Sequence, residues 1–66
     1  MQITINGTQR EVAEGTSIAS LLAELELPSP TVAVEVNLEL IPRARHAEYR
    51  LGEGDRLEVV TLVGGG

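Results

Sequence analysis

Two stretches of the chain, residues 2–6 and residues 32–37, alternate large apolar side chains with polar or small ones. A period of two is typical of a β-strand with one buried face. We therefore predict a strand in each stretch. The residues expected to be buried are Ile3, Ile5, Val32, Val34 and Val36.

The dipeptide Asn6-Gly7 follows the first strand and predicts a tight turn. Both residue types tolerate the positive φ angles that a two-residue hairpin needs. A second strand is expected around residues 9–13, with Val12 as its clearest inward residue.

A helical period comes next, with four apolar residues spaced i, i+3, i+4 and i+7 on one face. These residues are Ile18, Leu21, Leu22 and Leu25. Either Thr16 or Ser17 can cap the backbone N–H groups at the start of the helix. Pro28 and Pro30 cannot continue it, so we expect the helix to end near Glu26.

The second half of the chain predicts two further strands. A short one at residues 39–41 is closed by Pro42, which suits a strand end or a sheet edge. Residues 43–50 show no period and are expected to be irregular or briefly helical. A turn at residues 52–55 leads into a last strand over residues 56–63.

This order of elements can bury its apolar faces if the helix covers one face of a mixed sheet. We therefore predict an α+β chain with the β-grasp, or ubiquitin-like, fold, in which about four to five strands pack on one helix. Thr4, Glu35 and Glu58 would lie on the opposite, solvated face. The domain is expected to cover residues 1–63, followed by a flexible glycine tail at residues 64–66.

Composition narrows the possible functions. The 66 residues are enough for one small domain, and the chain has no cysteine for a disulfide, a thiolate metal site or a nucleophile. Ten acidic residues against five arginines, with no lysine, give a net charge of −5, which argues against a nucleic-acid partner. The acidity could steer the chain toward a basic protein or simply keep it soluble.

No stretch suits a membrane span or a signal peptide, so we expect a cytoplasmic protein, monomeric when free.

Candidates for catalysis are few. His46 is the only histidine, is expected to lie in a surface loop, and cannot build a multi-histidine metal site. Ser17, Ser20 and Ser29 sit in no recognisable nucleophile motif. The glycines of residues 52–54 lack the downstream pattern of a phosphate-binding loop. We therefore expect no metal, no bound cofactor and no enzymatic activity of its own.

The chemistry is instead expected at the three glycines that follow the last strand. Glycine has no Cβ, so its carbonyl is unhindered and its backbone can lie extended in a narrow channel. Transfer of AMP from ATP to the Gly66 carboxylate would create a good leaving group for attack by sulfur or nitrogen. Gly65 would let the end enter an active site, and Gly64 would act as a spacer. An inert flexible tail is the alternative interpretation.

Three apolar residues near the tail, Val60, Leu62 and Val63, would form a docking patch if Leu57 and Val59 point inward. Ordinary core packing or scattered surface apolarity is the alternative.

These residues resemble the ThiS family of sulfur carrier proteins of thiamine biosynthesis along nearly the whole chain. The matching pieces are MQI and NG at residues 1–3 and 6–7, EGTSI and LL at 14–18 and 21–22, VAVEVN at 32–37, PR at 42–43, GDRLEVV at 54–60, and the closing glycines. Leu38 departs from the family pattern, in which a small or polar residue is more usual after the asparagine. It leaves the type of the local turn open.

The resemblance implies a carrier without catalytic side chains. A ubiquitin-activating-like enzyme (ThiF) would consume ATP to adenylate Gly66, and a cysteine desulfurase persulfide would supply sulfur for a C-terminal thiocarboxylate. Thiazole synthase (ThiG) would accept that sulfur to build the thiazole ring. The alternatives are a related β-grasp carrier for molybdopterin synthesis or tRNA 2-thiolation, a ubiquitin-like modifier of target lysines, or a plain interaction domain with an inert tail.

Overall fold

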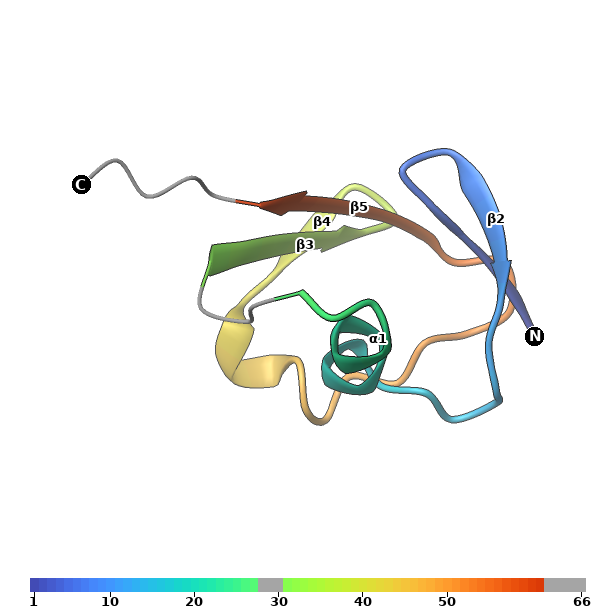
Figure 1. Ribbon diagram of the computed structural model, residues 1–66, viewed down its shortest axis with the longest axis horizontal. Helices are drawn as coiled ribbons and strands as arrows, with labels where there is room; N and C mark the ends of the chain where they lie inside the picture. The colour runs from blue at the N-terminus through green and yellow to red at the C-terminus, as the bar shows by residue number, and fades with distance from the viewer. Residues whose placement is uncertain (28–30, 62–66) are drawn as a thin grey trace.

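The computed structural model describes residues 1–27 and 31–61 (Figure 1). Within these residues the elements follow the predicted order, and the named ones are five strands, one α-helix and a short 3-10 helix. They are β1 (Gln2–Ile5), β2 (Thr8–Glu11), α1 (Ile18–Glu24), β3 (Val32–Val36), β4 (Glu39–Ile41), η2 (Arg43–Arg45) and β5 (Arg56–Thr61).

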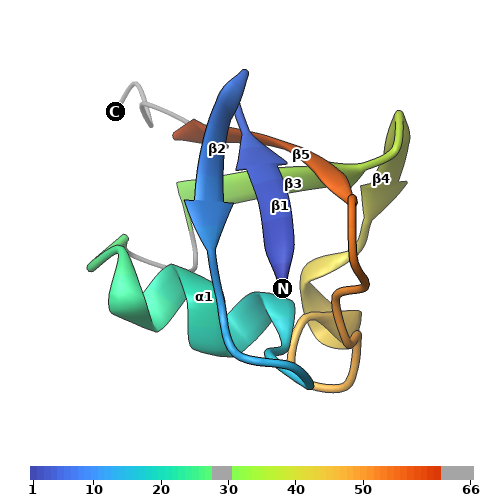
Figure 2. The ribbon, with the colours of Figure 1, turned by 90° about the vertical axis from the view of Figure 1, so that its right-hand side faces the viewer.

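The strands form one mixed sheet in the order β2-β1-β5-β3-β4. The last strand, β5, is therefore central, running parallel to β1 and antiparallel to β3. The short strand β4 lies at one edge, as Pro42 predicted. Figures 1 and 2 show α1 lying across one face of the sheet, and we refer to the opposite face as the outer face. This arrangement is the β-grasp fold, so the predicted fold class is confirmed.

The core lies between α1 and the sheet and contains the residues that the two periods marked. Its buried apolar members are Ile3, Val12, Ile18, Leu21, Leu22, Val32, Val34, Val36, Ile41, Leu51 and Leu57. Ile5 and Leu25 are half-buried against this cluster. Val12 is buried as predicted although β2 ends one residue earlier, at Glu11.

Both ends of α1 are closed by local hydrogen bonds. Ser17, one of the two predicted caps, accepts a hydrogen bond from the Ser20 N–H (3.1 Å) on its side-chain oxygen. At the other end, Glu26 has a φ of 57° and its N–H donates to the Ala23 carbonyl, while the Leu27 N–H donates to the Leu22 carbonyl. This is a Schellman motif, which turns the chain out of the helix ahead of the predicted proline stop at residues 28 and 30. Those two prolines lie outside the described residues.

The prediction that His46 lies in a surface loop is wrong. This side chain is 3% exposed, and its Nε2 lies 3.0 Å from the Ile41 carbonyl oxygen. The short helix η2 turns the chain back after β4, and the Ala19 N–H of α1 donates to the His46 carbonyl (3.0 Å). His46 therefore joins β4 to the start of α1. Because a carbonyl can only accept, Nε2 is the donor in this contact, and Nδ1 is buried without a hydrogen-bond partner.

Two-residue turns close both hairpins. Asn6 and Gly7 have φ angles of 50° and 84°, and Asn37 and Leu38 have 51° and 70°. Positive φ at both central residues is characteristic of a type I′ turn. The turn type that Leu38 left open is therefore the same as that of the first hairpin, with a leucine where glycine would be unstrained.

Candidate functional site

The strand β5 and the outer face around it form the described part of the candidate site. Five predicted site residues, Leu62, Val63, Gly64, Gly65 and Gly66, lie outside the described residues. The sixth, Val60, is on β5 and is 54% exposed. The expected alternation along this strand is confirmed, because Leu57 is buried and Val59 is half-buried against the core.

Hydrogen bonds hold β5 on both sides. Its pairing with β3 runs from Leu57, opposite Val36, to Thr61, opposite Val32. Its parallel pairing with β1 is much shorter, because β1 ends at Ile5.

The Asn6 side chain continues this second pairing beyond the end of β1. Its Oδ1 accepts a hydrogen bond from the Val59 N–H (2.8 Å), and its Nδ2 donates to the Val59 carbonyl (3.1 Å). We call these two bonds the Asn6 bridge. A side-chain amide here does what a backbone peptide group does in a sheet. The sequence analysis assigned Asn6 to a turn and missed this second role.

Asn37, in the other hairpin turn, holds the start of β5 in a related way. The Arg56 N–H donates to Asn37 Oδ1 (3.0 Å), and the Asn37 N–H donates to the Arg56 carbonyl (2.7 Å). Asn37 Nδ2 also donates to Asp55 Oδ1 (3.1 Å). Turn asparagines thus fix β5 at its first residue and again at Val59.

The outer face carries both charged and apolar residues. Arg56, Glu58 and Val60 alternate outward along β5, with Glu58 directly opposite Glu35 of β3. On the other side of β3, Glu35 is opposite Leu40 of β4. The predicted solvated character of this face is confirmed for Glu58, which is exposed, whereas Thr4 and Glu35 are half-buried.

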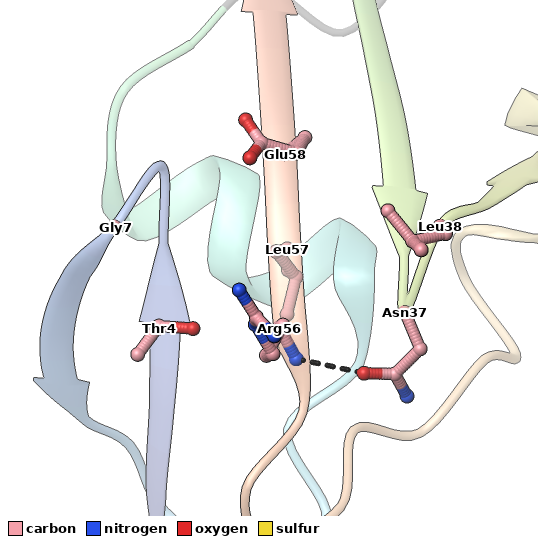
Figure 3. A pocket seen from close by; sticks show the side chains of 7 residues that line it. All are labelled: Thr4, Gly7, Asn37, Leu38, Arg56, Leu57 and Glu58. Atoms are coloured by element: carbon pink, nitrogen blue, oxygen red, sulfur yellow. Dashed lines mark hydrogen bonds between the residues drawn. The ribbon is translucent and has the colours of Figure 1, made fainter.

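Exposed apolar residues surround this row of charges. Leu38 is 91% exposed, Leu40 63% and Val60 54%, and these are the large exposed hydrophobic residues of the described chain. A hollow of about 460 Å³ opens between the two hairpin turns, with Gly7 on one side and Leu38 on the other, across Arg56 and Glu58 (Figure 3).

Charged and exposed apolar side chains that could bind a partner line this surface. Within residues 1–27 and 31–61, no three histidine or acidic side chains come together in a way that could hold a metal ion. The sole histidine is buried against β4, away from the hollow. In the same part of the chain, no helix is long and apolar enough to cross a membrane.

Comparison with known proteins decides the family. The model of the ThiS family matches residues 3–66. The chain belongs to the ThiS family. This ThiS-family chain is also similar, over all of its length, to the crystal structure of a thiamine biosynthesis protein (ThiS) from Geobacter metallireducens. The TM-score is 0.86, the sequence identity is 32%, and each chain is covered completely.

Relatives of different lengths match this member of the ThiS family. The sulfur carrier protein ThiS of Bacillus subtilis is 37% identical over 65 residues, which are 97% of this chain and 98% of the relative. A thiazole synthase of Paramagnetospirillum magneticum is 41% identical over 66 residues. The ThiS-family chain spans only 20% of the length of that larger protein.

Proposed function

We propose that this protein is the sulfur carrier of thiazole formation in thiamine biosynthesis and that it carries sulfur on Gly66. The observation that carries the proposal is the family match through residue 66, together with a relative called a sulfur carrier that aligns over nearly its full length. In this role the protein is a co-substrate of other enzymes and needs no bound cofactor.

The proposed chemistry has three balanced steps. The Gly66 carboxylate attacks the α-phosphorus of ATP and pyrophosphate leaves, which gives an acyl adenylate. A persulfide sulfur, supplied by a cysteine desulfurase, attacks the acyl carbon and AMP leaves. A thiol then reduces the resulting S–S bond by two electrons, leaving a thiocarboxylate on Gly66 and a disulfide on the thiol side.

The three glycines suit this chemistry because an active site must surround the end of the chain closely. Glycine lacks the Cβ that would obstruct attack on the carbonyl or widen the channel. Gly65 and Gly64 would thread through that channel while the folded domain stays outside as a handle. Val60, Leu62 and Val63, next to the channel mouth, would contact the enzyme.

The partners follow from the same steps. A ThiF-like adenylating enzyme would use ATP on Gly66, and thiazole synthase would receive the sulfur. The second partner is supported by the relative called thiazole synthase, in which a segment similar to this whole chain forms part of one larger protein.

The test is intact-mass analysis of the protein after incubation with the adenylating enzyme, ATP, cysteine and the desulfurase. We expect the mass to rise by the difference between one sulfur and one oxygen atom. Deletion of Gly66 should abolish this change while the thermal unfolding midpoint stays that of the full chain.

Three other outcomes would contradict the proposed sulfur-carrier function or its assigned site. Isopeptide-linked adducts on lysines of other proteins would make the chain a modifier. If the Gly66 carboxylate stays unmodified in the complete mixture, the protein would be interpreted as an interaction domain with an inert tail. Sulfur incorporation that survives deletion of Gly66 would contradict the assigned site.

A further inference from the structure

The chain is poor in groups that could attack an activated acyl carbon. Lysine amines, cysteine thiols and histidine rings are the side chains that do so without help from a neighbouring base, once they are deprotonated. The 66 residues include no lysine, no cysteine and one histidine. Hydroxyl groups are weak nucleophiles unless a general base lies beside them. Two groups therefore have to be placed in the fold, the His46 ring and the α-amino group of Met1.

The fold removes the His46 ring from reach. The side chain is 3% exposed, its Nε2 is engaged with the Ile41 carbonyl (3.0 Å), and its Nδ1 is buried. An acyl group cannot approach either nitrogen while the domain stays folded. For the same reason the ring cannot serve as a general base for an exposed hydroxyl group.

The α-amino group of Met1 is held by two acceptors. It donates to the Val12 carbonyl (2.7 Å) and to Glu11 Oε2 (3.2 Å), and we call these two bonds the Met1 clamp. A free α-amino group is neutral, and thus nucleophilic, at a lower pH than a lysine amine. To attack an acyl carbon it must lose a proton and turn its lone pair toward that carbon, which breaks bonds of the clamp. The clamp therefore opposes acyl transfer to this amine.

The register of the sheet also keeps the amine away from the tail of its own chain. Thr4 lies opposite Arg56 in the parallel pairing of β1 and β5. Counted from this pair, Met1 is three residues back and Thr61 is five residues onward, which places them about 26 Å apart along the strands. Figure 1 shows the N-terminus and the end of β5 at opposite ends of the molecule. The five residues after Thr61 span at most about 18 Å, so an attacking amine would have to come from a second copy.

Basic positions carry arginine where lysine would serve the fold equally well. All five arginines are exposed. Arg50 donates from Nη1 to the Gly15 carbonyl (2.8 Å), and Arg45 Nε lies 3.8 Å from Glu48 Oε1. A lysine ammonium could make either contact. A guanidinium is not deprotonated in proteins, so it supplies positive charge without a nucleophilic amine.

We propose that the chain presents no free amine or thiol to an activated Gly66, so that the acyl group passes only to nucleophiles of partner enzymes. The inference rests on the proposed function, because it requires activation of Gly66. In the reaction avoided, an amine nitrogen of one copy attacks the acyl carbon of another. A C–N bond forms, AMP leaves with the electron pair of the broken C–O bond, and the amine proton goes to solvent. The amide would join two carriers and consume the end that accepts sulfur.

The test uses the full chain with a Gly66 thioester, made by intein cleavage with a small thiol, in place of the acyl adenylate. The thioester either hydrolyses or passes to an amine of a second copy, and intact mass gives the ratio of amide-linked to hydrolysed chain. Arg10→Lys, at an exposed position of β2, adds one amine at unchanged charge. We expect the ratio to rise at least about tenfold, because the neutral fraction of lysine exceeds that of arginine about a hundredfold at the same pH. The control Arg10→Gln, which adds no amine, should leave the ratio unchanged.

Glu11→Gln tests the Met1 clamp. It removes the ion pair with the ammonium at an exposed position, so its thermal unfolding midpoint should stay close to that of the unmodified chain. The ratio should rise about two- to fivefold, the effect of losing an exposed ion pair, and peptide mapping should place the amide at Met1. Glu14→Gln is the matched control, because Glu14 is also exposed and the charge changes by the same amount. It should leave the ratio unchanged.

Two results would overturn the inference. One is the same ratio in Arg10→Lys as in the unmodified chain, which would reduce the lack of lysine to a bias of composition. The other is acylation of Met1 in the unmodified chain as readily as in Glu11→Gln. Neither depends on the adenylating enzyme, so both differ from failure of the proposed function, in which the mass of the chain would not change in the complete sulfur-transfer mixture.

Discussion

The Asn6 bridge should contribute a measurable part of the stability of the domain. Its two hydrogen bonds to the Val59 backbone are exposed, and each is worth about 0.5–1.5 kcal/mol net. Replacement by glycine keeps the positive φ of the turn without strain and removes both bonds, so Asn6→Gly should lose about 1–3 kcal/mol. A domain of 66 residues has a total stability of about 3–10 kcal/mol, so this loss is a large share.

Asn6→Asp separates the two bonds. The carboxylate can still accept from the Val59 N–H but cannot donate to the Val59 carbonyl, so it should lose about half as much, roughly 0.5–1.5 kcal/mol. It also controls for the extra backbone freedom that glycine gives the unfolded chain. Urea unfolding supplies the free energies, and each 1 kcal/mol should move the thermal midpoint by about 4–8 °C.

Amide hydrogen exchange localises the effect. In Asn6→Gly the Val59 N–H loses its acceptor and should exchange faster, whereas the amides of its neighbours, which point toward β3, should change less. Unchanged unfolding free energy together with a protected Val59 amide in Asn6→Gly would refute the reasoning.

Three further predictions concern α1 and the segment beside it. Ser17→Ala should lose about 1 kcal/mol in urea unfolding, because the Ser20 N–H loses its capping acceptor; no loss would contradict the cap. Glu26→Gly should raise the free energy of unfolding by up to about 1 kcal/mol, because glycine suits the positive φ of residue 26. The control Glu24→Gly, inside the helix, should lower it by about 1 kcal/mol. A lower free energy of unfolding in both variants would argue against the Schellman motif. His46→Ala should cost about 2–4 kcal/mol, through a cavity and an unpaired Ile41 carbonyl, and an effect below about 0.5 kcal/mol would mean that the histidine is not buried in solution.

The elements were predictable where the chain repeats a local pattern. The alternation in residues 32–37 gave β3 its buried face, and Asn6-Gly7 gave the first hairpin its turn type. The positions i, i+3, i+4 and i+7 gave α1 its buried side. These signals depend on neighbouring residues only, so they can be read without knowing what packs against them.

The features that were missed depend on residues distant in the chain. Asn6 contacts Val59, 53 positions away, and nothing in the sequence near either residue indicates that contact. His46 lies in a segment without a period, and its burial depends on where η2 directs the chain relative to β4 and α1. The position of Glu35 opposite Glu58 depends on the register of β3 and β5, which a one-residue slip would change.

The central place of β5 has a mechanical consequence. An enzyme that grips the chain beyond Thr61 pulls along β5, whose hydrogen bonds to its neighbours run roughly across the direction of that force. Such a force would load the bonds to β1 and β3, the Asn6 bridge and the Asn37 contacts together, whereas a force across the strand would break its bonds one at a time. The fold can therefore be drawn against a partner by its last residues while the body of the domain keeps its shape.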